Sequence, residues 1–402
     1  RLVASARAAR LDAAGTLRLA GPGAFEARGQ LKNFDPRAFV SSAPAAELDT
    51  RFSLKGQRLP QLAGQLDFEL ASSTFEGKPL AGKGELRLDG SHLAHADLAL
   101  EIAGNRLSAK GRYGKPGDAL DVHLDAPSLA TLGHGLGGRL KLDGVLRGSV
   151  EHPAGEFELL GEKLGFGTLR VDTVNGRGRL AEGRSGAIAL TLGLTGLGRI
   201  AEKEALVHRA SFVFDGSRAA NTARLEVIGR GAQAGALSLA GQLGDGPRWE
   251  GRLESLEVRG DYPVVLHAPA PLLLSRDVLR LGAAELRGGS GGRYRLDETR
   301  WQARHLVARG SMGGVQVGVI LDPSTRAVKS RGDSLQIGGE WALAIAEQVD
   351  GPVRLDREKG ERELQGERTH WLRPRIIGYS IVLAVMVGVF SYSMITRVPL
   401  EL

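Results

Sequence analysis

Short segments in which every second residue is apolar recur along most of this chain, and they restrict the folds open to it. Residues 84–90 have the sequence GELRLDG, and residues 138–144 have the sequence GRLKLDG. Side chains two positions apart lie on one face of a β-strand, so each segment presents a leucine face and a polar face. The flanking glycines are predicted to form turns, because glycine takes positive φ without a steric penalty. The pattern therefore predicts an antiparallel β-meander.

The sequence up to about residue 355 contains no amphipathic helix longer than a turn or two. Two short helices are predicted, one over residues 125–132 with Ser128 as N-cap, and one over residues 34–39 with Asp35 as N-cap and Pro36 in the first position. A sheet with a leucine face must cover that face, and no helix is available to do so. At about 8–12 residues per strand and turn, these residues make roughly 30 strands, which is more than an open sheet carries without curling. We therefore predict an all-β fold, a long curled antiparallel sheet with a groove, resembling a solenoid.

Composition excludes several classes of protein. Glycine accounts for 57 of the 402 residues, about twice its average share, which argues against a helical bundle. The chain has no cysteine, so it forms no disulfide, thiolate metal site or iron–sulfur cluster. The net charge of +7 comes from basic residues spread along the chain, whereas a nucleic-acid interface would gather them on one face among aromatic residues. We predict no nucleic-acid partner.

The motifs that resemble catalytic or metal sites lack the structural context that such sites need. Residues 288–292 match the letters of a nucleophile elbow, but a strand-like segment follows where a helix is required, so a hairpin turn is predicted. Residues 133–138 match G-x-G-x-x-G, and again a strand is predicted to follow. His92 and His95 have no third ligand nearby in the sequence, so they are predicted to be surface residues. We therefore predict no enzymatic activity, no cofactor and no metal.

The C-terminal residues differ from the rest of the chain. Residues 376–396 carry no charge and are long enough to cross a bilayer as a helix, which would contain Ile376, Leu383, Val389 and Ile395. Basic residues are more frequent before this helix than after it, so its N-terminal side is predicted to lie in the cytoplasm. The sequence predicts four parts: an elongated β-groove over residues 1–355, a charged linker over 356–372, a transmembrane helix over 373–397 and a short tail over 398–402.

Several segments, in their order along the chain, resemble TamB-like proteins, which are AsmA-like subunits of a translocation and assembly module. The resemblance covers about residues 1–360 and lies in residues 77–86, 98–107, 118–122, 126–130, 138–144, 249–256, 269–274, 281–286 and 334–341. It implies a curled, taco-shaped sheet in the periplasm of a Gram-negative bacterium, anchored in the inner membrane. It also implies an Omp85-type outer-membrane barrel as partner, and a role in phospholipid transport or outer-membrane protein assembly.

The tail resembles a different family. Residues 373–379 and 396–402 are similar to a transmembrane segment of the CcoG/FixG cytochrome oxidase accessory proteins. That family has a cysteine cluster before this helix, and the present chain has none. The predicted helix orientation also conflicts with a periplasmic groove. We therefore expect the chain to be a fragment, formed by fusion of two gene pieces.

The predicted function is non-catalytic passage of phospholipid acyl chains along an aliphatic groove. Two alternatives remain: a structural β-solenoid whose leucine faces pack together without lipid, and a membrane accessory protein of cytochrome oxidase assembly. The predicted lining residues are Leu17, Leu19, Leu66, Phe68, Leu86, Leu88, Leu140, Leu142, Leu237 and Leu239.

Overall fold

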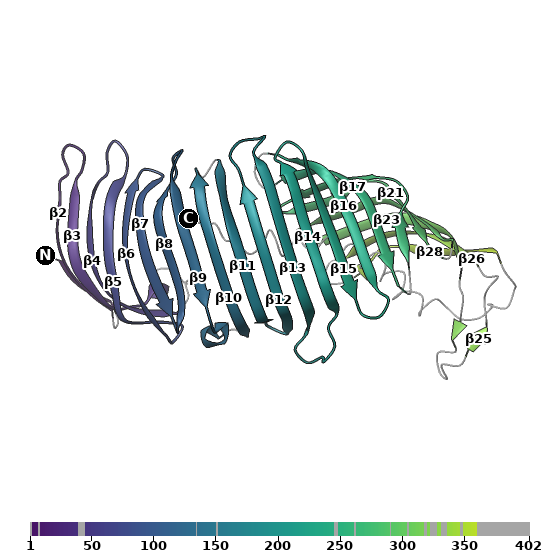
Figure 1. Ribbon diagram of the computed structural model, residues 1–402, viewed down its shortest axis with the longest axis horizontal. Helices are drawn as coiled ribbons and strands as arrows, with labels where there is room; N and C mark the ends of the chain where they lie inside the picture. Colours follow the sequence, from purple (N-terminus) through teal and green to yellow (C-terminus); the bar gives the residue numbers. More distant parts are fainter. Residues whose placement is uncertain are drawn as a thin grey trace. The chain divides into compact units, whose positions relative to one another are not determined.

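The protein is built almost entirely of antiparallel β-strands (Figure 1). The computed structural model describes residues 2–6, 9–38, 45–133, 135–149, 152–244, 248–260, 263–289, 291–303, 305–316, 320–321, 328–330, 336–345 and 349–359. Over these residues the only helices are two short 3-10 turns, η1 (Pro36–Ala38) and η2 (Leu129–Leu132). The all-β prediction is therefore confirmed.

The predicted transmembrane helix, with Ile376, Leu383, Val389 and Ile395, lies outside the described residues. In the part of the chain that is described, no helix has the length and hydrophobicity needed to cross a membrane.

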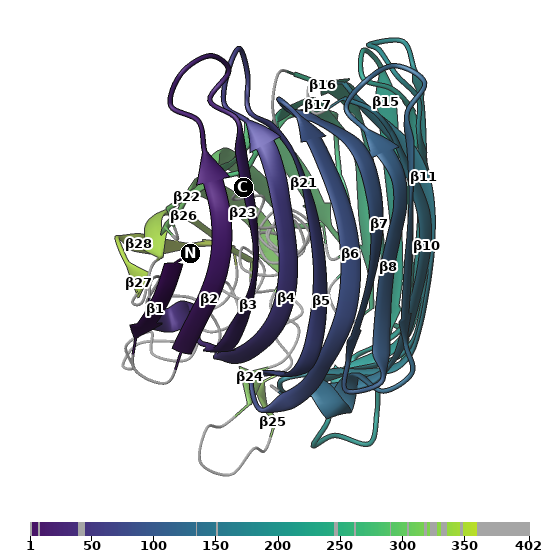
Figure 2. The same cartoon turned by 90° about the vertical axis from the view of Figure 1, so that its left-hand side faces the viewer.

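The chain forms two compact units, residues 1–215 and 216–402. In unit 1, each strand from β1 to β13 pairs antiparallel with the next strand in the sequence. The strands are β1 (Leu2–Ala6), β2 (Ala9–Leu17), β3 (Phe25–Phe34), β4 (Ala46–Gln57), β5 (Ala63–Phe75), β6 (Lys78–Asp89), β7 (His92–Ile102), β8 (Asn105–Tyr113), β9 (Ala119–Ala126), β10 (Leu136–Gly148), β11 (Pro153–Phe166), β12 (Leu169–Leu180) and β13 (Ala187–Arg199). The predicted meander is thus present. Strands β2 to β8 curve in the same direction (Figure 2).

The boundary between the units falls within β14 (Val207–Ser217). Unit 2 departs from the simple meander, because β18 and β19 both pair with β17, and β20 and β21 both pair with β22. Its strands are β15 (Asn221–Gly229), β16 (Ala234–Leu243), β17 (Arg248–Arg259), β18 (Val264–Leu266), β19 (Ala270–Ser275), β20 (Val278–Leu281), β21 (Ala284–Gly288), β22 (Arg293–Gln302), β23 (His305–Gln316), β24 (Ile320–Leu321), β25 (Val328–Ser330), β26 (Gln336–Ile345), β27 (Val349–Asp350) and β28 (Val353–Lys359). Strand β28 continues into the start of the segment 356–372 predicted as a linker. The division into four parts stays a prediction.

The glycines of the alternating segments are mostly not turn residues, which corrects the sequence prediction. Gly84 and Gly144 lie inside β6 and β10. Gly90, in contrast, occupies the turn after β6 with φ of 62°. Gly84 and Gly144 are therefore strand residues, and Gly90 is a turn residue.

The two short helical turns lie where they were predicted, but only one of them is capped as expected. The Asp35 carboxylate accepts a hydrogen bond from the backbone N–H of Arg37 at 3.0 Å, as an N-cap does. The Arg37 side chain also donates to it, which holds the pKa of Asp35 below its usual value. Ser128 makes no side-chain capping bond. Instead, the buried Asn105 accepts the Ser128 N–H and donates to Thr131.

The two units bury their apolar side chains to different extents. In unit 2, large side chains such as Leu253, Leu272 and Leu279 are 3–4% exposed. In unit 1, the buried apolar residues are mainly alanines, together with Leu80 and Leu120. The strands of unit 1 make their main contacts with the strands beside them in the sheet. The described part of unit 1 is therefore a single layer with a half-buried apolar face.

Candidate functional site

Three rows of apolar residues and glycines, interrupted only by Thr50, cross the sheet of unit 1 from β2 to β13. The rows follow from the strand registers, in which directly opposed residues share one face. The first row is Leu11, Leu31, Thr50, Leu70, Gly82, Leu100, Leu107, Leu124, Leu142, Leu159, Gly176 and Leu192. The second is Ala13, Gly29, Phe52, Phe68, Gly84, Leu98, Ala109, Val122, Gly144, Phe157, Gly178 and Leu190. The third is Gly15, Ala27, Leu54, Leu66, Leu86, Ala96, Gly111, Leu120, Leu146, Gly155, Leu180 and Ile188.

We call the surface made by these rows the apolar face. Thr50 is its one polar side chain. With neighbouring strands about 4.8 Å apart, twelve strands make a face about 50 Å long, and three rows make it about 13 Å wide. This face is several times longer than one bilayer leaflet is thick, since the whole hydrocarbon core measures about 30 Å. It is wide enough to hold extended hydrocarbon chains.

Side chains of the apolar face are only partly withdrawn from solvent. Leu107 is 36% exposed and Leu146 is 46% exposed, and most of the other leucines in the rows are half-buried. Full burial of a leucine or phenylalanine is worth about 1.5–3 kcal/mol. Covering the exposed parts of these side chains with an apolar ligand would therefore be favourable, because it completes their burial.

Aromatic rings and leucines of the apolar face lie across glycines of the adjacent strand. A Cβ placed on Gly84 would come within 2.6 Å of Cε1 of Phe68, its neighbour on β5. The Phe157 ring lies just as close over Gly178 on β12. Since a side chain at either glycine would collide with the ring, the glycines let the rings lie flat. At these two positions the ring of one strand therefore covers the backbone of the next strand.

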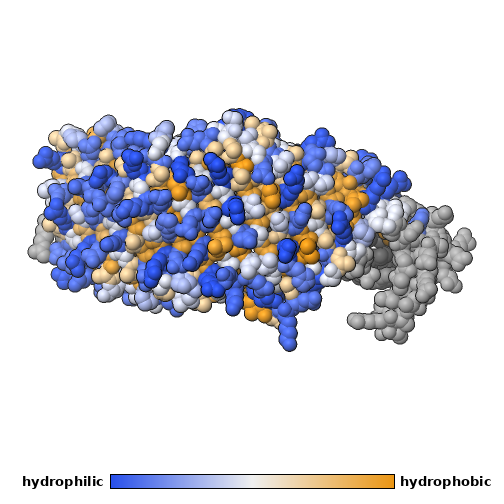
Figure 3. All heavy atoms as spheres, in the orientation of Figure 1, coloured by the Kyte–Doolittle hydropathy of each residue, from blue (hydrophilic) through white to orange (hydrophobic). Residues whose placement is uncertain are grey.

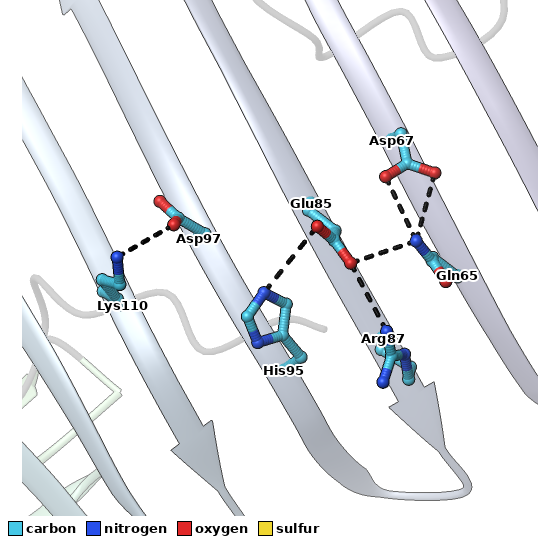
Figure 4. Close-up of polar contacts among 7 residues, drawn as sticks. All are labelled: Gln65, Asp67, Glu85, Arg87, His95, Asp97 and Lys110. Atoms are coloured by element: carbon cyan, nitrogen blue, oxygen red, sulfur yellow. Dashed lines mark hydrogen bonds and ion pairs between the residues drawn. The ribbon is translucent and has the colours of Figure 1, made fainter.

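The opposite face of the same strands is charged and solvated. In Figure 4, the Gln65 amide donates to Glu85 at 3.0 Å, and Lys110 pairs with Asp97 at 3.2 Å. Arg87 and His95 lie 3.4 and 3.9 Å from Glu85. Hydrophilic residues also predominate where Figure 3 shows strands β2 to β8. Exposed ion pairs of this kind add little to the free energy of unfolding. The main effect of the charged face is to keep one side of the sheet hydrated.

Most of the predicted lining residues lie on the leucine side of their strands. The registers place Leu66, Leu86, Phe68 and Leu142 in the three rows, and Leu140 lies beside them opposite Gly161. The remaining predicted residues lie nearer the edge of unit 1 or in unit 2.

Two of these outer residues are close to the strand ends. Leu88 is opposite Gly64 and 45% exposed, and Leu17 is opposite Phe25 and 57% exposed. Leu19 lies beyond the end of β2 and is 80% exposed. Their predicted contact with lipid is not tested by the structure.

Leu237 and Leu239 belong to unit 2. They are opposite Leu256 and Leu253, both 3% exposed. Leu237 and Leu239 are themselves half-buried, like the leucines of the apolar face, but these two neighbours on β17 are fully buried.

The prediction from sequence overlooked the glycines of the apolar face and several of its large residues. Gly82 and Gly84 precede Leu86 at two-residue spacing, and Gly176 and Gly178 precede Leu180 in the same way. Treating glycine as an apolar member of the alternation would have placed these positions on the face.

The motifs that resembled catalytic or metal sites have structural roles in the described residues. Gly288 and Gly292 flank the hairpin between β21 and β22, joined by a backbone hydrogen bond of 2.7 Å. Strand β10 begins at Leu136, inside residues 133–138, so a strand and not a helix follows the first glycines of that motif. His92 departs from the surface position predicted for it, because its side chain is 13% exposed and lies 2.9 Å from Asp118. No cluster of three or more potential metal ligands occurs in the described part of the chain.

Comparison with family models matches residues 1–272 to the model described as TamB, N-terminal domain. The match leaves out residues 273–402, so the resemblance of the tail to CcoG/FixG proteins has no support from it. No curated protein and no solved structure gives a significant match.

Proposed function

Because the chain belongs to the family of the TamB N-terminal domain, we propose that the apolar face of unit 1 carries phospholipid acyl chains. The observation that carries this proposal is the set of three apolar rows, interrupted only by Thr50 and half-buried along twelve strands. The protein acts by solvation of the tails and without catalysis.

The energetics favour a continuous apolar path. Moving an acyl chain through water costs about 0.8 kcal/mol per CH₂, or roughly 25 kcal/mol for two 16-carbon tails. Because the rows have no charged position, a tail can exchange one contact for the next without passing through water. The flat rings over glycine avoid a local barrier along the path.

The place of the protein in the cell is part of the same proposal. We propose that unit 1 lies in the periplasm, that the full protein is held at the inner membrane, and that it works with an Omp85-type barrel at the outer membrane. Assembly of outer-membrane proteins on the same surface is the second proposed role. An extended segment of such a protein has one apolar side, as a strand does, and that side could contact the apolar face.

Photo-crosslinking tests the lipid proposal. A photoreactive amino acid is placed at Leu86 or Leu140, and at Arg87 or Lys141 as controls that are one residue away on the opposite face. After irradiation of the full chain in membranes, mass spectrometry measures the phospholipid attached to it. We expect attachment at Leu86 and Leu140 to exceed attachment at the two controls at least fivefold.

Leu239 provides a further comparison, since its neighbour on the adjacent strand of unit 2, Leu253, is buried. Attachment at Leu239 should be lower than at Leu86 if an open apolar face is what binds lipid. Equal attachment on both faces of unit 1 would refute the proposal. Absence of lipid at all positions would favour the structural β-solenoid.

A further inference from the structure

A second surface, in unit 2, has the features of an anion site. A hollow of about 450 Å³ is lined by residues of β21, β22 and β23 and by His267. Its charged lining residues are three arginines, Arg287, Arg293 and Arg295, against one carboxylate, Glu285. We call this surface the arginine hollow.

The registers place the three arginines at neighbouring positions of the sheet. Arg287 is directly opposite Arg293, and Arg295 is two residues further along the same strand, so all three share one face. Gly313 is opposite Arg293 on the other side and has no side chain to fill the space. Like charges directly opposite in a sheet are destabilising. The arrangement therefore costs stability unless an anion neutralises it.

The arginines are incompletely paired within the described residues. Arg295 donates to Asp297 at 2.9 Å, and Arg287 donates to Nε2 of His267 at 3.0 Å, which is a neutral acceptor in that bond. The side chain of Arg293 has no hydrogen-bond or ion-pair partner among the described residues, and Glu285 makes no ion pair there with the opposed Arg295. Two of the three guanidinium groups thus lack a carboxylate.

We propose that the arginine hollow binds a phosphate group through Arg287 and Arg293. The planar guanidinium presents paired N–H donors that match two phosphate oxygens, and Arg287 and Arg293 are directly opposed on adjacent strands. The three arginines are exposed to solvent, and the hollow of about 450 Å³ has a size that suits a compact anion better than an extended acidic polypeptide. The phosphate comes either as the free ion or as a phosphodiester such as a lipid headgroup, and both have this chemistry. The proposal does not depend on lipid binding to unit 1.

Titration calorimetry on the full chain tests the proposal with two soluble probes. Inorganic phosphate represents the free ion, and glycerophosphoglycerol represents a headgroup without its tails. We expect saturable binding of at least one probe, weakened tenfold or more in the R287Q/R293Q variant. The R287K/R293K variant keeps the charge but loses the paired donors, so it should fall between the wild type and the glutamine variant.

The matched control is R224Q/R280Q, which removes the same charge from exposed strand positions of unit 2 outside the hollow. It should bind like the wild type, and circular dichroism should report an unchanged fold in all variants. Equal losses in both double-glutamine variants would show nonspecific charge attraction and overturn the proposal. It would also be overturned if neither probe binds, or if a glutamate-rich peptide binds at the hollow more tightly than both. A stronger response to one probe identifies the source of the phosphate.

Discussion

The contact between Phe68 and Gly84 makes the sharpest test of how the apolar face is built. In G84A, the new Cβ would lie 2.6 Å from Cε1 and 2.8 Å from Cζ of Phe68, so the ring must lift from the sheet. Overpacking of this kind costs about 1–3 kcal/mol. The reduced freedom of the unfolded chain offsets it by about 0.4–1 kcal/mol. We expect a net loss of about 0.5–2 kcal/mol of the free energy of unfolding.

The matched control is G137A, which is also in a strand of unit 1. A Cβ there would have no neighbour closer than 3.6 Å, so only the effect on the unfolded chain remains. G137A should therefore raise the free energy of unfolding by about 0.4–1 kcal/mol. Denaturant unfolding followed by circular dichroism measures both variants. The opposite signs make the comparison robust against errors in either magnitude.

Removal of the Phe68 ring should abolish the destabilisation caused by G84A. In an F68A background, G84A should become neutral or stabilising, which gives a coupling energy of about 1–3 kcal/mol between the two sites. The reasoning is refuted if G84A behaves like G137A, or if the effects of F68A and G84A simply add.

Three further outcomes follow from contacts in the structure. N221A should lower the free energy of unfolding by about 1–3 kcal/mol in denaturant titration, because it leaves the buried Trp249 indole N–H, now 2.6 Å from the Asn221 oxygen, without an acceptor; a loss below 0.5 kcal/mol would contradict this account. E85Q should change stability by less than about 1 kcal/mol, since its ion-pair partner Arg87 is exposed and its bond to Gln65 is only part-buried; a larger loss in the same assay would mean that the polar network is structural. Burial raises the pKa of Tyr294, so its phenolate should form above the usual range of tyrosine in an ultraviolet absorbance titration, and Y294F should reduce the absorbance change there; a titration curve identical to the wild type would be inconsistent with a partly buried phenol.

The alternation of leucine and polar residues was sufficient to predict the fold class. A spacing of two residues, repeated over so many segments, indicates β-strands with one apolar face. It also placed Leu66, Phe68, Leu86, Leu140 and Leu142 on one side of their strands. Register could not be predicted in the same way, since it depends on which residues face each other across strands.

The role of the glycines needed that register. Gly84 is compatible with a turn by composition, and only its position opposite Phe68 shows that the ring excludes a side chain there. The difference between the units was hidden for a related reason. Leu86 and Leu239 have the same local pattern and are both half-buried, yet Leu253, the neighbour of Leu239 on the adjacent strand, is buried. Burial is a property of what lies across the face, which local sequence does not contain.

The pairing of each strand of unit 1 with the next one in the sequence also bears on how its length can change. Interactions are then limited to nearest neighbours, as in repeat proteins, so stability grows strand by strand and folding can spread from any hairpin. Insertion or loss of two consecutive strands preserves the antiparallel order and keeps every leucine on its side. A one-residue shift in the register of a strand would instead move its leucines to the charged face. Evolution can therefore adjust the reach of the molecule in steps of one hairpin, about 10 Å each, without redesigning its surface.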